Sequence, residues 1–130
     1  MKSELLYLAL ATAITGLLWV PYVINRAMVW GLADTVGYPD NPKPLSPWAE
    51  RLKRAHANAV ENLVIFAPLV LTAHAMGFTT ETTVAAAGAY VVGRLIHAAA
   101  YVAKLPWLRT IGFTIGWLAC AVIAWQILVR

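Results

Sequence analysis

Charged residues are scarce in this chain, and they are unevenly placed. Asp, Glu, Lys and Arg make up 12% of the 130 residues, and hydrophobic residues make up 61%. A soluble domain would carry about 25% charged residues. Residues 5–25, 62–80 and 110–129 contain no charged side chain. Each of these stretches is close to the ~20 residues that a helix needs to cross a bilayer. The composition therefore excludes an ordinary soluble domain and indicates a membrane protein.

Cysteine is almost absent too. The single Cys120 excludes an internal disulfide and a CxxC redox pair. The histidines show no metal-ligand spacing, so no metal site is expected, and His56 and His74 are interpreted as structural. The net charge of +4 is modest, and the basic residues are scattered along the chain. Neither feature gives a reason to expect nucleic acid as a partner.

A fourth apolar run, 82–103, is interrupted only by Arg94 and His97. Backbone polar groups in lipid must be bonded internally, so four spanning helices are the economical solution. The expected fold is an all-α integral membrane four-helix bundle, formed by one domain, 1–130. Pro21 should kink the first helix, and Ser46 should cap the second. The expected helices cover about 4–32, 47–76, 80–104 and 107–129.

The basic residues predict the orientation. Most of them fall near the loop between the first two helices or the loop between the last two. The opposite side carries Lys2, Arg130 and, in its loop, only Glu81. The positive-inside rule therefore places the first and third loops in the cytoplasm and both termini outside.

Polar residues form one stripe on each of the two central helices. Apart from the adjacent pair Glu61 and Asn62, the members of each stripe are spaced three or four residues apart, which places each stripe on one helical face. The second helix carries Arg51, Arg54, Asn58, Glu61 and Asn62, and the third carries Tyr90, Arg94, His97, Tyr101 and Lys104.

Counted from the basic side, the two stripes reach the same depth. Asn58 is level with His97, and Glu61 is level with Arg94, roughly 15 Å into the helices. Ionisable groups at such depth normally face a partner or a cavity. Glu61 and Arg94 could be a purely structural ion pair, and the whole set could be structural polar contacts. We favour a ligand site that opens to the cytoplasm, lies within one subunit or between two, and suits a small zwitterionic peptide of net negative charge.

Two motifs carry a family resemblance. "ERLKRAHANAVEN" followed by an apolar run, together with the R-x-x-H-x-x-x-Y pattern in "VGRLIHAAAYVAKL", resembles the MAPEG family of eicosanoid and glutathione metabolism. The likeness continues through "LRT" and "WQIL" and is greatest to microsomal glutathione transferases and prostaglandin E synthases. It implies a homotrimer that binds glutathione as co-substrate between subunits and acts on a lipophilic small molecule.

The resemblance also implies residue roles. Arg109 matches the catalytic arginine, and Thr110 stands where a serine is common. The positions that match glutathione contacts are Arg26, Arg51, Arg54, Asn58, Glu61, His97 and Tyr101. Arg94, from the polar stripe, is added to this predicted binding set. The match of Arg26 rests on its place near the cytoplasmic end of the first helix.

The chemistry expected is that of a thiolate. A free thiol has a pKa of about 8.5 and reacts as its anion. The guanidinium of Arg109, the hydroxyl of Thr110 and the positive N-terminus of the last helix would favour that anion. Conjugation to an electrophile, or reduction of a lipid hydroperoxide, would follow.

Three positions depart from the patterns of the family. Phe113 stands where the eicosanoid branch often has a tyrosine, and Ala57 stands where the prostaglandin branch commonly has an arginine. Ile65 replaces a familiar proline, with Pro68 three residues later. These changes indicate a less specialised transferase or peroxidase. The alternatives are a non-catalytic lipid-binding protein on the same scaffold and a small proton-coupled transporter.

Overall fold

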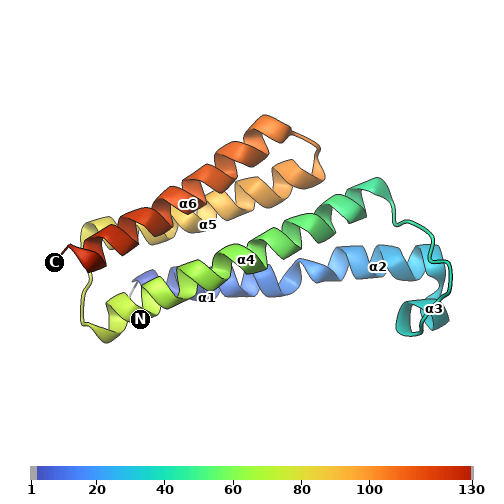
Figure 1. Cartoon of the computed structure of the whole chain (residues 1–130), viewed down its shortest axis with the longest axis horizontal. Coiled ribbons are helices and arrows are strands. Elements are labelled where there is room, and N and C mark those ends of the chain that lie inside the picture. Colours follow the sequence, from blue (N-terminus) through green and yellow to red (C-terminus); the bar gives the residue numbers. More distant parts are fainter. Residues whose placement is uncertain (1–2, 130) are drawn as a thin grey trace.

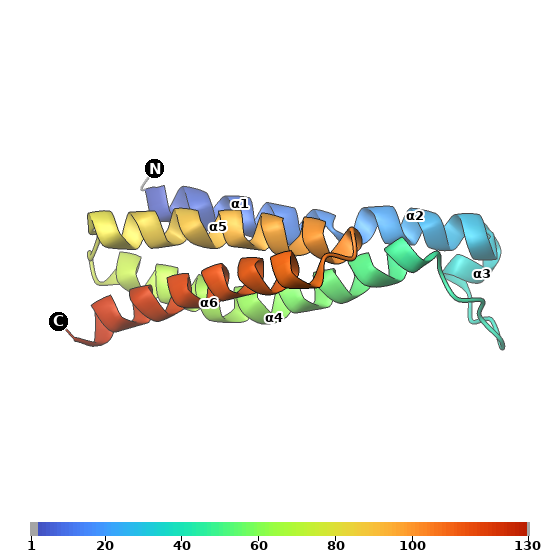
Figure 2. The same cartoon turned by 90° about the horizontal axis from the view of Figure 1, so that it is seen from above.

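The computed structural model describes residues 3–129, and every regular element in this range is a helix (Figures 1 and 2). α1 with α2, and α4, α5 and α6 each by itself, are long and apolar enough to cross a membrane. The predicted all-α bundle with four membrane-crossing segments is confirmed. The helices are α1 (Ser3–Leu17), α2 (Trp19–Trp30), α3 (Leu32–Val36), α4 (Pro47–Ala75), α5 (Glu81–Val102) and α6 (Pro106–Leu128).

Pro21 interrupts the first membrane-crossing segment. A proline has no N–H, and its ring crowds the carbonyl four residues earlier, which here belongs to Leu17. α1 accordingly ends at Leu17, and α2 begins at Trp19. The interruption is a single residue, Leu18, whose backbone stays helical, so α1 and α2 together form one span of 28 residues, interrupted close to the predicted kink. α4, by contrast, continues through Pro68.

Two polar contacts join α2 to α4. Asn25, 6% exposed, donates from its amide to Ser46 Oγ at 2.9 Å and accepts from the backbone N–H of Ser46 at 3.0 Å. Ser46 thus holds the N-cap position as predicted, but its hydroxyl binds Asn25 and does not cap α4. One turn earlier on α2, Tyr22 Oη and His56 Nδ1 are hydrogen-bonded at 2.8 Å.

The helices run back and forth between the two ends of the bundle. The start of α1, the α4–α5 turn and the end of α6 meet at one end (Figures 1 and 2). α3, the loop to α4 and the α5–α6 turn lie toward the other end, called here the basic end because the arginines and lysines of the two stripes gather there. The first and third loops thus share a side, as predicted. That this side is cytoplasmic stays a prediction, and Lys2 and Arg130 lie outside the described residues.

α5 and α6 touch backbone to backbone at two glycines. A Cβ atom on Gly112 would lie 2.6 Å from the backbone nitrogen of His97. One on Gly93 would lie 2.8 Å from the carbonyl oxygen of Gly112. Small residues allow helices in a membrane to approach this closely. The contact buries His97, which is 3% exposed.

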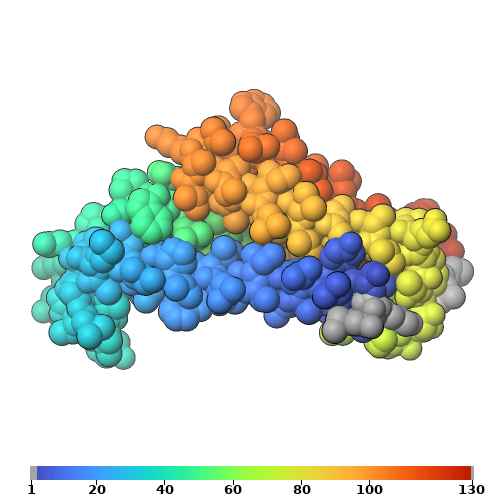
Figure 3. Space-filling model, turned by 180° about the vertical axis from the view of Figure 1, so that it is seen from behind, coloured from blue at the N-terminus to red at the C-terminus, as the bar shows by residue number. Residues whose placement is uncertain are grey.

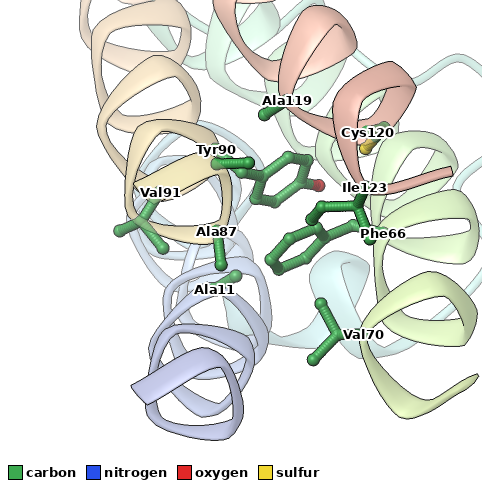
Figure 4. Close-up of a cluster of buried hydrophobic side chains, with 10 residues drawn as sticks. Ala11, Phe66, Val70, Ala87, Tyr90, Val91, Ala119, Cys120 and Ile123 are labelled. Carbon is green, nitrogen blue, oxygen red and sulfur yellow. The ribbon is translucent and has the colours of Figure 1, made fainter. Parts of the chain in front are cut away.

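The apolar core lies between α1, α4, α5 and α6, in the half of the bundle away from the basic end (Figure 4). Phe66 of α4 and Tyr90 of α5 stack at its centre, with ring centroids 3.7 Å apart and planes 8° apart. Tyr90 is 1% exposed. Its assignment to the polar stripe is therefore wrong, because its ring packs as an apolar surface within the core.

Candidate functional site

A cavity of about 300 Å³ opens at the basic end between α4, α5 and the start of α6. This volume is at the lower end of the ~300–1,000 Å³ typical of small-molecule sites. All four charged residues that line it are cations. The lining consists of Arg51, Arg54, Ala100, Tyr101, Lys104, Leu105, Pro106 and Arg109. Four of the predicted site residues, Arg51, Arg54, Tyr101 and Arg109, are therefore brought together.

The tight turn between α5 and α6 shapes this cavity. The N–H of Lys104 donates to the carbonyl of Tyr101, and the N–H of Leu105 donates to that of Ala100. This is the Schellman pattern, in which a left-handed residue ends the helix. Lys104 takes that position with φ 61°, although it is not a glycine. Pro106 then starts α6 at once, so the side chains of Tyr101 and Arg109 meet across the turn.

A chain of polar contacts leads from the cavity into the bundle. The guanidinium carbon of Arg109 lies 5.0 Å from the centroid of the Tyr101 ring. The rings of Tyr101 and His97 meet edge to face at 5.5 Å. Arg94 Nη2 then lies 3.3 Å from His97 Nδ1 and donates to Asn58 Oδ1 at 2.6 Å. Arginine can only donate, so His97 Nδ1 is the acceptor.

The two stripes therefore meet within one protomer. Asn58 of α4 bonds Arg94 of α5, and Arg51 Nε donates to the carbonyl of Val102 at 2.9 Å. The second bond places a cation on the C-terminus of α5, where the helix dipole favours it. The polar stripes of α4 and α5 thus face each other, as their periodicity predicted.

The predicted pairing of Glu61 with Arg94 is wrong. Arg94 reaches toward the basic end and bonds Asn58 instead. Glu61 is exposed on α4 and makes no ion pair or hydrogen bond with any residue in the range 3–129. Arg94 is 7% exposed, and its Nε and Nη1 atoms are buried without a partner among the described residues. Arg94 thus lies behind the cavity and holds Asn58 and His97.

Asn58 and His97, like Glu61 and Arg94, are not part of the cavity lining, and the last two predicted residues, Thr110 and Arg26, lie away from it as well. Thr110 is exposed, and its hydroxyl donates to the carbonyl of Pro106 at 3.0 Å. Arg26 lies on α2, with its guanidinium carbon 5.1 Å from the centroid of the Trp30 ring. Lys104, by contrast, lines the cavity although it was not predicted as a site residue. Its place at the edge of the second stripe was the available signal.

A second, apolar cavity of about 250 Å³ lies between α4 and α6. Its one amide side chain, Asn62, donates to both the carbonyl and the side-chain oxygen of Asn58. The apolar cavity therefore begins where the polar contacts end. It is lined by Asn62, Ile65, Leu69, Trp117, Cys120, Ala121 and Ala124.

Four membrane-crossing helices, with a cationic cavity at one end and an apolar cavity between α4 and α6, define a multi-pass integral membrane protein. Compared with known protein families, residues 8–129 match the MAPEG family, and the chain belongs to that family. This confirms the resemblance carried by the helix motifs. The protein is thus a membrane protein of the glutathione and eicosanoid metabolism group. A search of curated proteins finds no match.

Proposed function

We propose that this protein is a glutathione-dependent transferase or peroxidase that acts on lipophilic electrophiles, and that it works as a homotrimer. The observation that carries the proposal is the basic cavity, where Arg109 lies over Tyr101 beside Arg51 and Arg54. Membership of the MAPEG family supports the same substrate class.

Charge complementarity favours glutathione at this cavity. The tripeptide has two carboxylates and one ammonium group, so it is a net anion. Arginine forks suit carboxylates, and Arg51 and Arg54 would take these groups. Tyr101, which lines the cavity, would bind a peptide group. Glu61, whose carboxylate is exposed, would take the ammonium group, and Asn58 and His97, which lie deeper than the lining, would bind further peptide groups.

Arg109 is placed to hold the thiolate. Stacking on Tyr101 leaves the in-plane N–H donors of its guanidinium free. It stands in the first turn of α6, where the helix dipole is positive. Both effects stabilise an anion at the sulfur. Thr110 would assist only if its hydroxyl left the carbonyl of Pro106.

The lipophilic substrate would lie in the apolar cavity between α4 and α6, which begins at Asn62. In conjugation, the thiolate sulfur forms a bond to the electrophilic carbon, and the leaving group departs with the bonding electrons. In peroxide reduction, two glutathione molecules are oxidised to the disulfide, and the hydroperoxide becomes an alcohol and water.

The test is turnover by protein purified in detergent, with glutathione and a generic aryl halide. Arg109→Ala should lower kcat about 100-fold or more, the usual cost of losing one donor to a developing anion. Arg109→Lys should lose less, because it keeps the charge but not the fork. Binding of glutathione without turnover would favour the non-catalytic alternative. If wild-type protein neither binds nor uses glutathione, the proposal is wrong.

A further inference from the structure

An open groove of about 520 Å³ lies between α5 and α6, in the half of the bundle away from the basic end. It shares no residue with the basic cavity or with the apolar cavity between α4 and α6, so the proposed function makes no use of it. Figure 3 shows α5 at the surface of the molecule, from its yellow start to its orange end. The groove is therefore open to the surroundings of the protein.

The groove is apolar and is formed by side chains of unequal length. Ala86 of α5 and Ala119 of α6 form its floor, and they are buried. Leu118 and Val122 of α6 line it as well, and both are exposed. The short side chains of the floor beside the long ones of α6 leave a channel that apolar material could fill.

The groove is about as deep as one leaflet of a bilayer. At about 1.5 Å per residue, the distance along α5 from Glu81 to Ala89 is roughly 12 Å. Ile115 lines the far end, where its Cγ2 atom would lie 2.9 Å from a Cβ atom on Gly93. Ile115 thus packs directly on the backbone of α5 and closes the groove near the middle of that helix. One leaflet contributes about half of the ~30 Å hydrocarbon layer, or ~15 Å.

This depth favours a lipid over a helix as the occupant. A membrane-crossing helix of a second copy, or of another protein, would need a face along the whole ~30 Å layer. The groove offers less than half of that length, because Ile115 closes it. An acyl chain of a phospholipid crosses only one leaflet and therefore fits.

The open end of the groove carries a free carboxylate. Glu81 lies in the first turn of α5, is exposed, and makes no hydrogen bond or ion pair with any residue in the range 3–129. It stands where the membrane-crossing segment begins, which is the level of lipid headgroups. A carboxylate only accepts hydrogen bonds, and a primary ammonium group has three donors to offer it. A quaternary ammonium group has none, so the charge and the donors together favour a primary amine.

We propose that the groove binds one acyl chain of phosphatidylethanolamine, whose primary ammonium headgroup pairs with Glu81. The assignment goes beyond the proposed function and does not depend on it, because the groove and the basic cavity lie in different halves of the bundle.

Native mass spectrometry of the detergent-purified protein tests the headgroup. Dioleoyl phosphatidylethanolamine is compared with dioleoyl phosphatidylcholine, which has the same chains and the same phosphate. Wild-type protein should bind the first lipid about fivefold more tightly, the upper range for an exposed ion pair. Glu81→Gln should bind the two lipids equally. Asp34→Asn is the matched control, since Asp34 is an exposed acid on α3, toward the basic end, and should keep the preference.

A second pair of variants tests the groove itself. Ala89→Phe would fill the channel and should abolish binding of both lipids. Val92→Phe is its control, because Val92 is an exposed residue of α5 that does not line the groove. Positions 89 and 92 are both exposed, so a ring at either should leave the core intact, and thermal unfolding checks that each variant folds.

Three results would overturn the proposal while leaving the glutathione reaction untouched. Equal binding of the two lipids by wild-type protein, or equal losses in Glu81→Gln and Asp34→Asn, would leave Glu81 with only its favourable place at the start of a helix. Unchanged lipid binding by Ala89→Phe would place the lipid elsewhere. A smaller oligomer in Ala89→Phe than in wild type would show that a second copy covers the groove.

Discussion

The two helical hairpins of this protein are held together by different means. In the C-terminal hairpin, α5 and α6 are joined by a tight turn and touch backbone to backbone at Gly93 and Gly112. In the N-terminal hairpin, α2 and α4 are joined by a long loop and by polar side chains such as Asn25 and Tyr22. Backbone contact sets one distance between helices, whereas side-chain hydrogen bonds tolerate small shifts.

This difference matches the roles proposed for the two hairpins. Arg109, which would hold the thiolate, and Tyr101, against whose ring it lies, both belong to the hairpin with the fixed spacing. Arg51 and Arg54, which would bind the carboxylates, lie on α4 of the other hairpin. We expect the chemistry to depend on the first hairpin and the capture of glutathione on the second.

The largest effect should come from the glycine contact. Gly112→Ala would place a methyl group 2.6 Å from the backbone nitrogen of His97, so the helices must separate. We expect a loss of about 3 kcal/mol in the free energy of unfolding, at the upper end of overpacking, together with a loss of turnover. Thermal unfolding in detergent measures the first, and the aryl halide assay measures the second.

Gly16→Ala in α1 is the matched control. A Cβ atom on Gly16 would meet nothing within 4 Å, so the change should stabilise the helix by about 0.5–1 kcal/mol. Equal effects of the two substitutions would remove the distinction between the hairpins.

A smaller effect is expected where the two hairpins meet. Thr83 of α5 donates to Glu4 Oε1 of α1 at 2.7 Å, and Glu4 is 5% exposed. Thr83→Val removes the one hydrogen bond that this carboxyl group makes within residues 3–129, together with the bond that Thr83 Oγ1 accepts from the N–H of Thr80, and should cost about 2 kcal/mol. The exposed neighbour Thr82→Val should cost almost nothing. Chemical denaturation of both variants compares them, and a similar loss for each would show that the Glu4 contact contributes little.

The smallest effect is expected at the turn of the C-terminal hairpin. Lys104 has a left-handed backbone and lines the basic cavity. Lys104→Gly should raise the unfolding free energy by about 0.5–1 kcal/mol, because glycine adopts φ 61° without strain. It should also weaken glutathione binding, because a cation is lost. A variant that is both more stable and binds more tightly would contradict the assignment of Lys104 to the site.

The sequence predicts the helices and their polar faces well because both follow from periodicity. Asn58 and Arg94 meet because each lies on the inward face of its helix. Counting residues from the basic end places the Cα atoms of Arg94 and Glu61 at the same level, and this predicted the wrong partner. The long side chain of Arg94 reaches about one turn away from its own Cα atom and bonds Asn58, which lies nearer the basic end. Tyr90 was misplaced because a tyrosine at helical spacing fits an apolar core as well as a polar face.

The central claim is that the polar edges of α4 and α5 form one glutathione pocket at the basic end. Calorimetric titration of the purified protein with glutathione tests it most directly, with Arg54→Ala compared with its neighbour Lys53→Ala. Arg54 lines the cavity and Lys53 does not. The account predicts saturable binding that Arg54→Ala weakens about tenfold or more and Lys53→Ala leaves unchanged, since charge-assisted hydrogen bonds contribute ~1.5–3 kcal/mol. Absence of binding by the wild-type protein, or equal losses in the two variants, would contradict it.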